Sequence, residues 1–291
     1  MSTAPRVGFN PLTWFSIPGG RAAAPPIDVI YREIRDAGFS AVHAEVPEGM
    51  SVNDYRGLLT EVGLEPAPGY FSAAFSDSAA MPAATEAAKR AASEHIQLGL
   101  DRIFIADGFG APSRATTPAQ GVDADADRLR TIIDNLGKVA TAMTAEGVLP
   151  CLHQHVGTWI ESPDELTTVL ESIPDNVLLF GPDTGHLAWA GADPAELIRR
   201  CNQRVGAVHL KDIRRQNAAG RDYRAAGAAH VWTEPGRGDV DFASVLQALF
   251  GFDGWYVVEV DIPDQPTPKE CARVSAQWVR AHFGATTPSG A

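Results

Sequence analysis

The stretch that decides the fold runs from Val177 to Asp212 and reads VLLFGPDTGHLAWAGADPAELIRRCNQRVGAVHLKD. It contains two short apolar runs, at 177–180 and 205–210, and each run is followed by or ends in side chains that can bind a metal ion. Between them, residues 194–201 place apolar side chains at helical spacing. The stretch therefore predicts a strand, a helix and a second strand, with polar chemistry at both strand ends.

The rest of the chain repeats this alternation of strands and helices. Apolar runs predict eight strands at 6–10, 39–46, 64–70, 102–106, 148–155, 177–180, 205–210 and 255–260. Helical spacing predicts helices at 27–37, 52–62, 81–98, 123–146, 162–172, 194–201, 242–250 and 268–283. Strict alternation implies parallel strands, and eight such units close most simply into a (β/α)8 TIM barrel.

The chain shows no low-complexity linker, so we expect a single α/β domain. The predicted barrel covers residues 6–283, between an N-terminal tail at 1–5 and a flexible C-terminal tail at 284–291. A long loop is expected from 213 to 238. An open doubly wound sheet is the alternative architecture, but no GxGxxG motif follows the first predicted strand.

The composition excludes several classes of protein. The formal net charge of −12 argues against a nucleic-acid partner or an anionic membrane surface, since both need concentrated positive charge. No apolar run is long enough to span a membrane, and the N-terminus lacks a signal-peptide pattern. The three cysteines are far apart, which indicates neither a disulfide framework nor a CxxC zinc site. We therefore expect a cytoplasmic protein.

Polar side chains gather where the predicted strands end, which is where barrel active sites lie. These residues are Asn10, Glu45, His153 with His155, Asp183 with His186, His209 with Lys211, and Glu259 with Asp261. Residues two apart on a strand share a face, so each of the last two pairs is expected to point together, as is His153 with His155. Imidazole and carboxylate ligands from separate strands suit manganese, cobalt, iron or zinc.

Structural roles compete with this interpretation at each position. A single strand-end histidine or carboxylate is more often a hydrogen-bonded structural group than a ligand. Lys211 and Asp212 could simply pair with each other. The tryptophans at 14, 159, 189 and 232 could wall a sugar-sized pocket or pack in the core. His43 could share a face with Glu45, whereas His95 and His282 lie within predicted helices.

The motifs resemble a known family. LLFGPDTGHLAWAGADP, RVGAVHLKDIR, VWTEPGRGDVDF and GWYVVEVD are similar to the xylose isomerase-like TIM barrels of the sugar phosphate isomerase/epimerase type, and within them to inosose dehydratases (2-keto-myo-inositol dehydratases). The segments VGFNPLTW and HQHVGTWIES carry the same resemblance, which spans nearly the whole chain.

The resemblance implies one divalent metal ion, manganese or cobalt, with zinc, iron or magnesium as alternatives. The superfamily binds this ion through Glu, Asp, His and Glu at the ends of strands five to eight. The last three ligands correspond to Asp183, His209 and Glu259. The first position departs from the pattern, because this chain has His153-Gln154-His155 there, so His153 is the implied fourth ligand and His155 a neighbouring acid or base.

This departure bears on the expected reaction. Epimerases of the superfamily use two carboxylates on opposite faces of one carbon, and here the first is missing. A dehydratase needs only one base and one acid, so we expect a metal-dependent lyase that abstracts a proton alpha to the ketone of a keto-polyol or keto-sugar, with inosose as the first choice. The expected catalytic residues are His155, Glu259 and Lys211. The expected substrate contacts are Asn10, Trp14, Glu45, His186, Lys211 and His230.

Other activities remain open at this point. One is a ketose or inosose isomerase or epimerase, and another is a lyase that cleaves 3-keto-glycosides by elimination. A third is a catalytically silent sugar-binding barrel, but in such a protein at least one of Asp183, His209 and Glu259 would be expected to be replaced, and all three are present here. DNA cleavage of the endonuclease IV type is disfavoured, because Ala228 stands where an aspartate would precede His230. The expected partner is a small keto-polyol or keto-sugar, with homo-oligomers formed through the outer helices.

Overall fold

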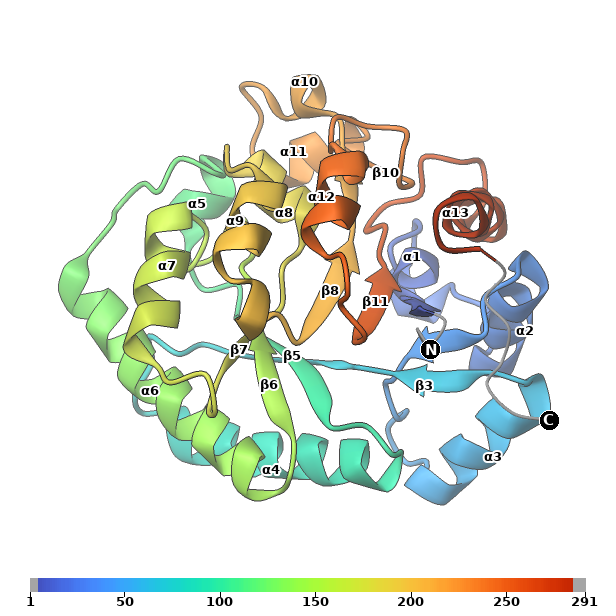
Figure 1. The fold of residues 1–291 in the computed structure, drawn as a ribbon, viewed down its shortest axis with the longest axis horizontal. Helices are drawn as coiled ribbons and strands as arrows, with labels where there is room; N and C mark the ends of the chain where they lie inside the picture. Colours follow the sequence, from blue (N-terminus) through green and yellow to red (C-terminus); the bar gives the residue numbers. More distant parts are fainter. Residues whose placement is uncertain (1–4, 285–291) are drawn as a thin grey trace.

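The computed structural model describes residues 5–284, so residues 1–4 and 285–291 of the two predicted tails lie outside the described residues. The chain forms a barrel of parallel strands surrounded by helices (Figure 1). The barrel strands are β1 (Arg6–Phe9), β2 (Ala41–His43), β3 (Glu65–Ala67) with β4 (Tyr70–Ala73), β5 (Arg102–Asp107), β6 (Leu149–Leu152), β7 (Leu179–Phe180), β8 (Ala207–Leu210) and β11 (Trp255–Val258).

The barrel closes through three different kinds of junction. Ladders of parallel strands run in the orders β3-β2-β1-β11-β8 and β4-β5-β6-β7. The chain passes directly from β3 to β4 through Pro68 and Gly69. Two isolated parallel bridges, Phe180 with Val205 and Asp183 with His209, join the β7 side to the β8 side. The predicted (β/α)8 barrel is confirmed.

The outer helices lie within a few residues of their predicted bounds. They are α2 (Ile27–Ala37), α3 (Val52–Val62), α4 (Met81–Gln97), α6 (Ala126–Ala145), α7 (Pro163–Ser172), α9 (Pro194–Arg200), α12 (Phe242–Ala248) and α13 (Pro268–Phe283). Helix α7 begins with the predicted capping box, in which Ser162 and Glu165 each bond the other's backbone N–H. Within residues 5–284 no helix combines the length and apolar character that crossing a membrane requires.

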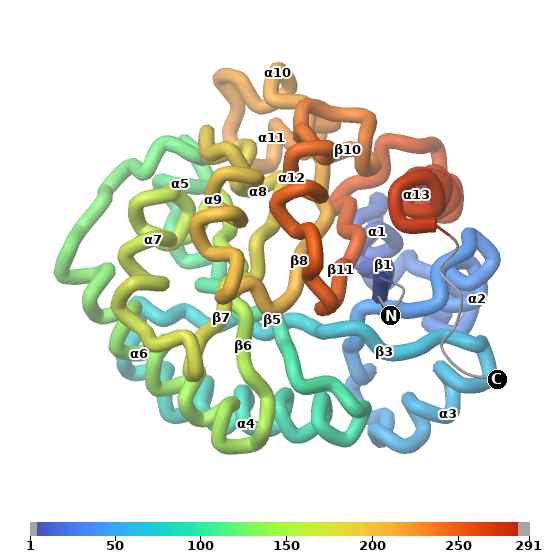
Figure 2. The backbone as a smooth tube through the Cα atoms, in the orientation of Figure 1, coloured from blue at the N-terminus to red at the C-terminus, as the bar shows by residue number. Residues whose placement is uncertain are grey.

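The segment expected to be a loop from 213 to 238 is structured, so that prediction is wrong. It contains β9 (Asp212–Ile213) and β10 (Trp232–Thr233), which pair antiparallel, and the short helices α10 (Arg215–Ala218) and α11 (Tyr223–Ala228). Both helices lie together at one edge of the barrel (Figure 2). The buried Asp212 carboxylate organises the segment by accepting hydrogen bonds from the backbone N–H groups of Gly236, Gly238 and Val240.

The opening stretch also holds an element that periodicity did not reveal. Helix α8 (Thr184–Trp189) lies between β7 and α9, and it has only six residues. Asp183 caps it by accepting the His186 N–H at 2.8 Å. A helix this short spans less than two turns, which is too little for an apolar repeat to identify it.

The third barrel strand, predicted at 64–70, breaks at Pro68 and Gly69 and continues beyond Tyr70 to Ala73 as β4. At the break, the Gly69 N–H donates to Nε2 of His95 at 2.9 Å, and Nδ1 of His95 lies 2.8 Å from the Ala91 carbonyl. A side chain at Gly69 would collide with the Ala44 carbonyl, so only glycine fits there. His95 thus holds the chain at the point where the third barrel strand stops pairing with β2, as β3, and begins to pair with β5, as β4.

We expect His95 to make the fold acid-sensitive. Burial lowers the pKa of His95 from 6.5 to about 4, so the folded state binds this proton less tightly than the unfolded state. The stability it supports is complete above pH 6.5 and is lost as pH falls toward 4. Denaturant titrations should show a loss attributable to His95 of about 2 kcal/mol between about pH 7 and about pH 5.

The variant His95→Gln removes the titrating ring, and it should lose less stability over this range than the wild type. His282→Gln, an exposed histidine of α13, is the matched control and should keep the wild-type slope. Equal slopes for all three proteins would contradict the role given to His95.

Candidate active site

The structure brings the four predicted metal ligands together at the carboxyl ends of the barrel strands. The ligand atoms of His153, Asp183 and His209 all lie within 4.8 Å of one another. Oε2 of Glu259 lies 3.6 Å from Nδ1 of His209. His153 follows β6, Asp183 follows β7, His209 is in β8 and Glu259 follows β11, so four neighbouring strand ends supply the group.

Local folding presents one oxygen of Asp183 to this group. Its Oδ1 caps α8, whereas its Oδ2 lies 3.7 Å from Nδ1 of His209 and has no hydrogen-bond donor. The bridge between Asp183 and His209 holds the two residues side by side across the β7–β8 junction. The cap therefore fixes the carboxylate and leaves its second oxygen available.

The buried polar atoms of this group fit a divalent metal ion. Within the described residues, both ring nitrogens of His209, Nδ1 of His153 and Oδ2 of Asp183 have no hydrogen-bond partner. Each such buried group costs about 1–3 kcal/mol if nothing pairs with it. Burial lowers the pKa of His153 far below its usual value, so its ring is neutral and offers a lone pair. Imidazole nitrogens with carboxylate oxygens are the donors that such ions take.

Lys211 lies beside this group, and its expected alternative pairing with Asp212 is wrong. Its Nζ lies 2.6 Å from Oε1 of Glu259, 2.6 Å from Oδ1 of Asp261 and 3.4 Å from Oδ2 of Asp183. Burial opposes the ammonium charge, but these carboxylates raise the pKa of Lys211 well above its usual value. Lys211 therefore stays protonated and neutralises buried negative charge.

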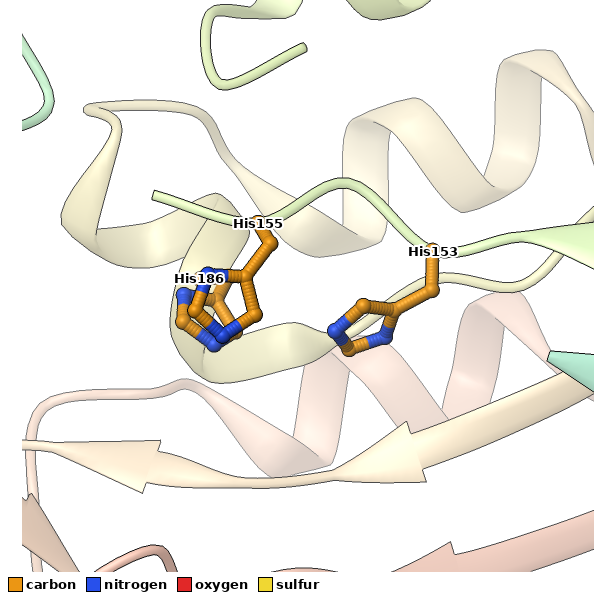
Figure 3. A group of neighbouring side chains, drawn as sticks. All are labelled: His153, His155 and His186. Carbon is orange, nitrogen blue, oxygen red and sulfur yellow. The ribbon is translucent and has the colours of Figure 1, made fainter. Parts of the chain in front are cut away.

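A second cluster of histidines adjoins the first. Figure 3 shows the rings of His155 and His186 against each other, with His153 to one side; the first two centroids are 3.8 Å apart. The ligand atoms of these three histidines also lie within 4.8 Å of one another. However, Nε2 of His186 lies 3.3 Å from the Lys211 ammonium, which disfavours a second cation there.

His155 is the member of this cluster whose ring is oriented by a hydrogen bond to the backbone. Its Nδ1–H donates to the Val156 carbonyl at 2.8 Å, which leaves Nε2 with a free lone pair. Burial lowers the pKa of His155 to about 4, so the ring is neutral near pH 7. The side chain lines the cavity described next.

A cavity of about 390 Å³ opens over the metal ligands. Its polar lining is Asn10, Arg21, His43, Glu45, Tyr70, Glu94, His95, His153, His155, Glu259 and Asp261. Arg21 is the only one of these described lining residues with a permanent positive charge, and it binds both oxygens of Glu45 at 2.7 and 2.8 Å. The cavity therefore carries an excess of negative charge.

Two of the predicted substrate contacts line the cavity. Asn10 donates to Oε2 of Glu259, so it also positions a candidate ligand. Glu45 lies at the mouth, where its carboxylate is engaged by Arg21. Glu259 itself is held from both sides, by Asn10 and by Lys211. This arrangement suits a fixed ligand better than the mobile base that Glu259 was also expected to be.

Three predicted substrate contacts lie outside the lining, and Lys211, the remaining one, lies beneath it. The Trp14 ring is buried against Phe9, and its N–H donates to Glu33 at 2.9 Å. His186 lies behind His155. His230 is about half exposed and faces Asp264 at 3.5 Å. The structure therefore does not place these three where they were expected.

Two residues of the cavity, His43 and Phe109, were not predicted as part of the site. His43 ends β2, is buried, and has no hydrogen-bond partner for either ring nitrogen in the described chain. Burial lowers its pKa to about 3. Phe109 is 64% exposed and contacts the His155 ring from the glycine-flanked loop after β5. His43 stands at a strand end, which was a usable signal, whereas nothing in the loop marked Phe109.

Comparisons with known proteins agree with this architecture. The family model described as "Xylose isomerase-like TIM barrel" matches residues 31–282. The inosose dehydratase of Geobacillus kaustophilus (strain HTA426) is 25% identical over 288 residues, which cover 94% of this chain and 93% of that protein. The inosose dehydratase of Geobacillus thermodenitrificans (strain NG80-2) is 32% identical, but the match covers only about half of each protein, 53% and 54%.

A solved structure shows the same fold. The probable 3-DHS dehydratase AsbF of Bacillus anthracis superimposes with a TM-score of 0.73 at 14% identity, over 94% of this chain and 98% of that one. Because the family model matches most of the chain, the assignment does not depend on any single relative. The chain belongs to the xylose isomerase-like TIM barrel family.

Proposed function

We propose that this protein is a metal-dependent dehydratase that removes water from a neutral keto-polyol, with an inosose as its first substrate. The observation that carries the proposal is that His153, Asp183 and His209, with Glu259 beside them, lie next to a neutral imidazole, His155, at one cavity. The full-length similarity to an inosose dehydratase supports the same reaction.

The charge of the cavity supports a neutral substrate. Four carboxylates line it, at Glu45, Glu94, Glu259 and Asp261, and its single guanidinium is already paired. Apart from the metal ion, the described lining offers no unpaired cation to a phosphate or carboxylate on the substrate, which would meet like charge there. Hydroxyl groups can instead donate to carboxylates and exchange hydrogen bonds with imidazoles.

The chemistry divides among the residues present. A divalent ion held by His153, Asp183, His209 and Glu259 would supply electrophilic stabilisation to the ketone oxygen. Nε2 of His155 accepts the proton from the carbon next to the ketone. The protonated ring then returns this proton to the hydroxide leaving the adjacent carbon, so one water is released and His155 is regenerated. Lys211 balances the charge of the carboxylates beneath.

The test is incubation of the manganese-loaded protein with scyllo-inosose in deuterated water, with a 3-keto-glucoside in parallel. We expect scyllo-inosose to lose water and to give a product with a conjugated ketone absorption. An isomeric product that carries deuterium would instead make the protein an isomerase or epimerase. Release of the aglycone from the 3-keto-glucoside alone would identify a keto-glycoside lyase. Either of these two results would overturn the proposal.

A further inference from the structure

We propose that His43 is a substrate-binding residue that holds hydroxyl groups of a neutral polyol against the β2 wall of the cavity. This inference rests on the proposed function for its substrate class. His43 ends β2, is only 5% exposed and lines the cavity. Neither Nδ1 nor Nε2 finds a hydrogen-bond partner within residues 5–284.

His43 and His95 both line the cavity, and they differ in whether their ring nitrogens have hydrogen-bond partners. The nitrogens of His95 are both used by the backbone, at Gly69 and Ala91, so its role in the fold accounts for it. The nitrogens of His43 are both free. A buried imidazole whose nitrogens are unpaired destabilises the folded protein, and hydrogen bonds from a ligand in the cavity would offset this cost.

Metal binding does not account for the unpaired ring nitrogens of His43 either. His43 belongs to neither set of side chains whose ligand atoms lie within 4.8 Å of one another. Its ring centroid is 6.1 Å from that of His209, so it lies beside the metal group rather than in it. A neutral imidazole offers one donor and one acceptor, which match the hydroxyl groups of a polyol.

The position of His43 also assigns it a part of the substrate. In the barrel, β2 lies beside β1 and β3, whereas His155 follows β6, which lies between β5 and β7. The two histidines therefore face the cavity from separate sides, with the metal ligands between them. His155 acts on the reacting carbon, so His43 binds hydroxyl groups distant from that carbon.

The first test is steady-state kinetics on scyllo-inosose. His43→Phe removes both hydrogen-bonding atoms, and KM should rise on the order of 10-fold to 100-fold with a much smaller change in kcat, because this binding is the same in the ground and transition states. His43→Gln keeps a donor and an acceptor and should recover part of the loss. His282→Gln, an exposed histidine of α13 outside the cavity lining, is the control and should leave KM unchanged. Metal content should equal the wild type in all three variants.

The second test does not depend on turnover. Protein with ¹⁵N-labelled histidine rings, loaded with zinc, is titrated with myo-inositol, and the His43 signals are identified by their loss in His43→Phe, or in His43→Gln if that variant alone folds. The His43 signals should shift together with those of His155.

The outcomes separate this inference from the proposed reaction. A shift of the His43 signals in a protein that does not dehydrate scyllo-inosose would end the proposed reaction and keep the polyol-binding role. Dehydration with normal KM in His43→Phe would keep the reaction and overturn the role. Shifts at His155 without shifts at His43, or no shift at either ring, would overturn the role as well.

Discussion

Glu259→Gln should lower kcat/KM by about 1,000-fold, since it removes a charged ligand that the surrounding residues hold in place. Oε1 of Glu259 receives the Lys211 ammonium at 2.6 Å, and Oε2 receives the Asn10 amide, so an uncharged amide cannot keep the same contacts. Metal analysis after reconstitution should also show weaker binding, by at least about tenfold. The circular dichroism spectrum should stay that of the wild type.

Glu94→Gln is the matched control for this experiment. Glu94 lines the same cavity, so the change removes one negative charge there without touching the metal group. Its kcat/KM should stay within a few-fold of the wild type, because Glu94 belongs to neither group of possible metal ligands. A Glu259→Gln variant that turns over as fast as Glu94→Gln would remove Glu259 from the ligand set.

Lys211→Met should cost about 3 kcal/mol of folding free energy in the metal-free protein, because it leaves buried carboxylates without their counter-charge. Lys211 is 1% exposed and contacts Glu259, Asp261 and Asp183. Turnover should be lost as well. Urea titration of the metal-free variant measures the first effect, and the scyllo-inosose assay measures the second.

A second substitution tests whether uncompensated buried charge causes the loss of stability in Lys211→Met. Adding Asp261→Asn to Lys211→Met removes one of the uncompensated charges and should recover part of the lost stability. Burial and the nearby Glu259 and Asp183 charges raise the pKa of Asp261 to about 6 even though the Lys211 ammonium lowers it. Lys89→Met, which removes an exposed lysine that pairs with Glu86 on α4, should change stability far less than Lys211→Met. Equal losses for Lys89→Met and Lys211→Met would show that the buried charge is not responsible.

The sequence was sufficient to predict the barrel because its evidence is local and repeated. Apolar runs alternate with helical spacing eight times, and single residues such as Ser162 mark helix starts that the structure confirms. Strand ends were less well predicted, because β6 stops at Leu152 and β11 at Val258 rather than including the polar residues beyond. The side chains after these ends still converge, since a barrel gathers all its strand ends on one rim.

Long-range contacts account for what the sequence did not predict. The hairpin of β9 and β10 depends on Asp212 reaching backbone groups more than twenty residues away, and no local pattern reports such contacts. The partners of Lys211 come from two other strand ends. His43 was noticed only as a neighbour of Glu45, because an unpaired buried nitrogen is a property of the assembled cavity.

The junction between β7 and β8 has a consequence for the local stability of the barrel. Ladders join the other neighbouring barrel strands, except at the β3–β4 break where the chain itself connects the sheets. Between β7 and β8 two isolated bridges connect the sheets, and the second bridge is the candidate ligand pair Asp183 and His209. A metal ion bound to both Asp183 and His209 would link the β7 side of the barrel to the β8 side, where only isolated bridges are found among the described residues. Removal of the metal ion by a chelator should therefore cause local unfolding first between β7 and β8. Amide hydrogen exchange at Gly206 and His209 should become faster before exchange in the other barrel strands does.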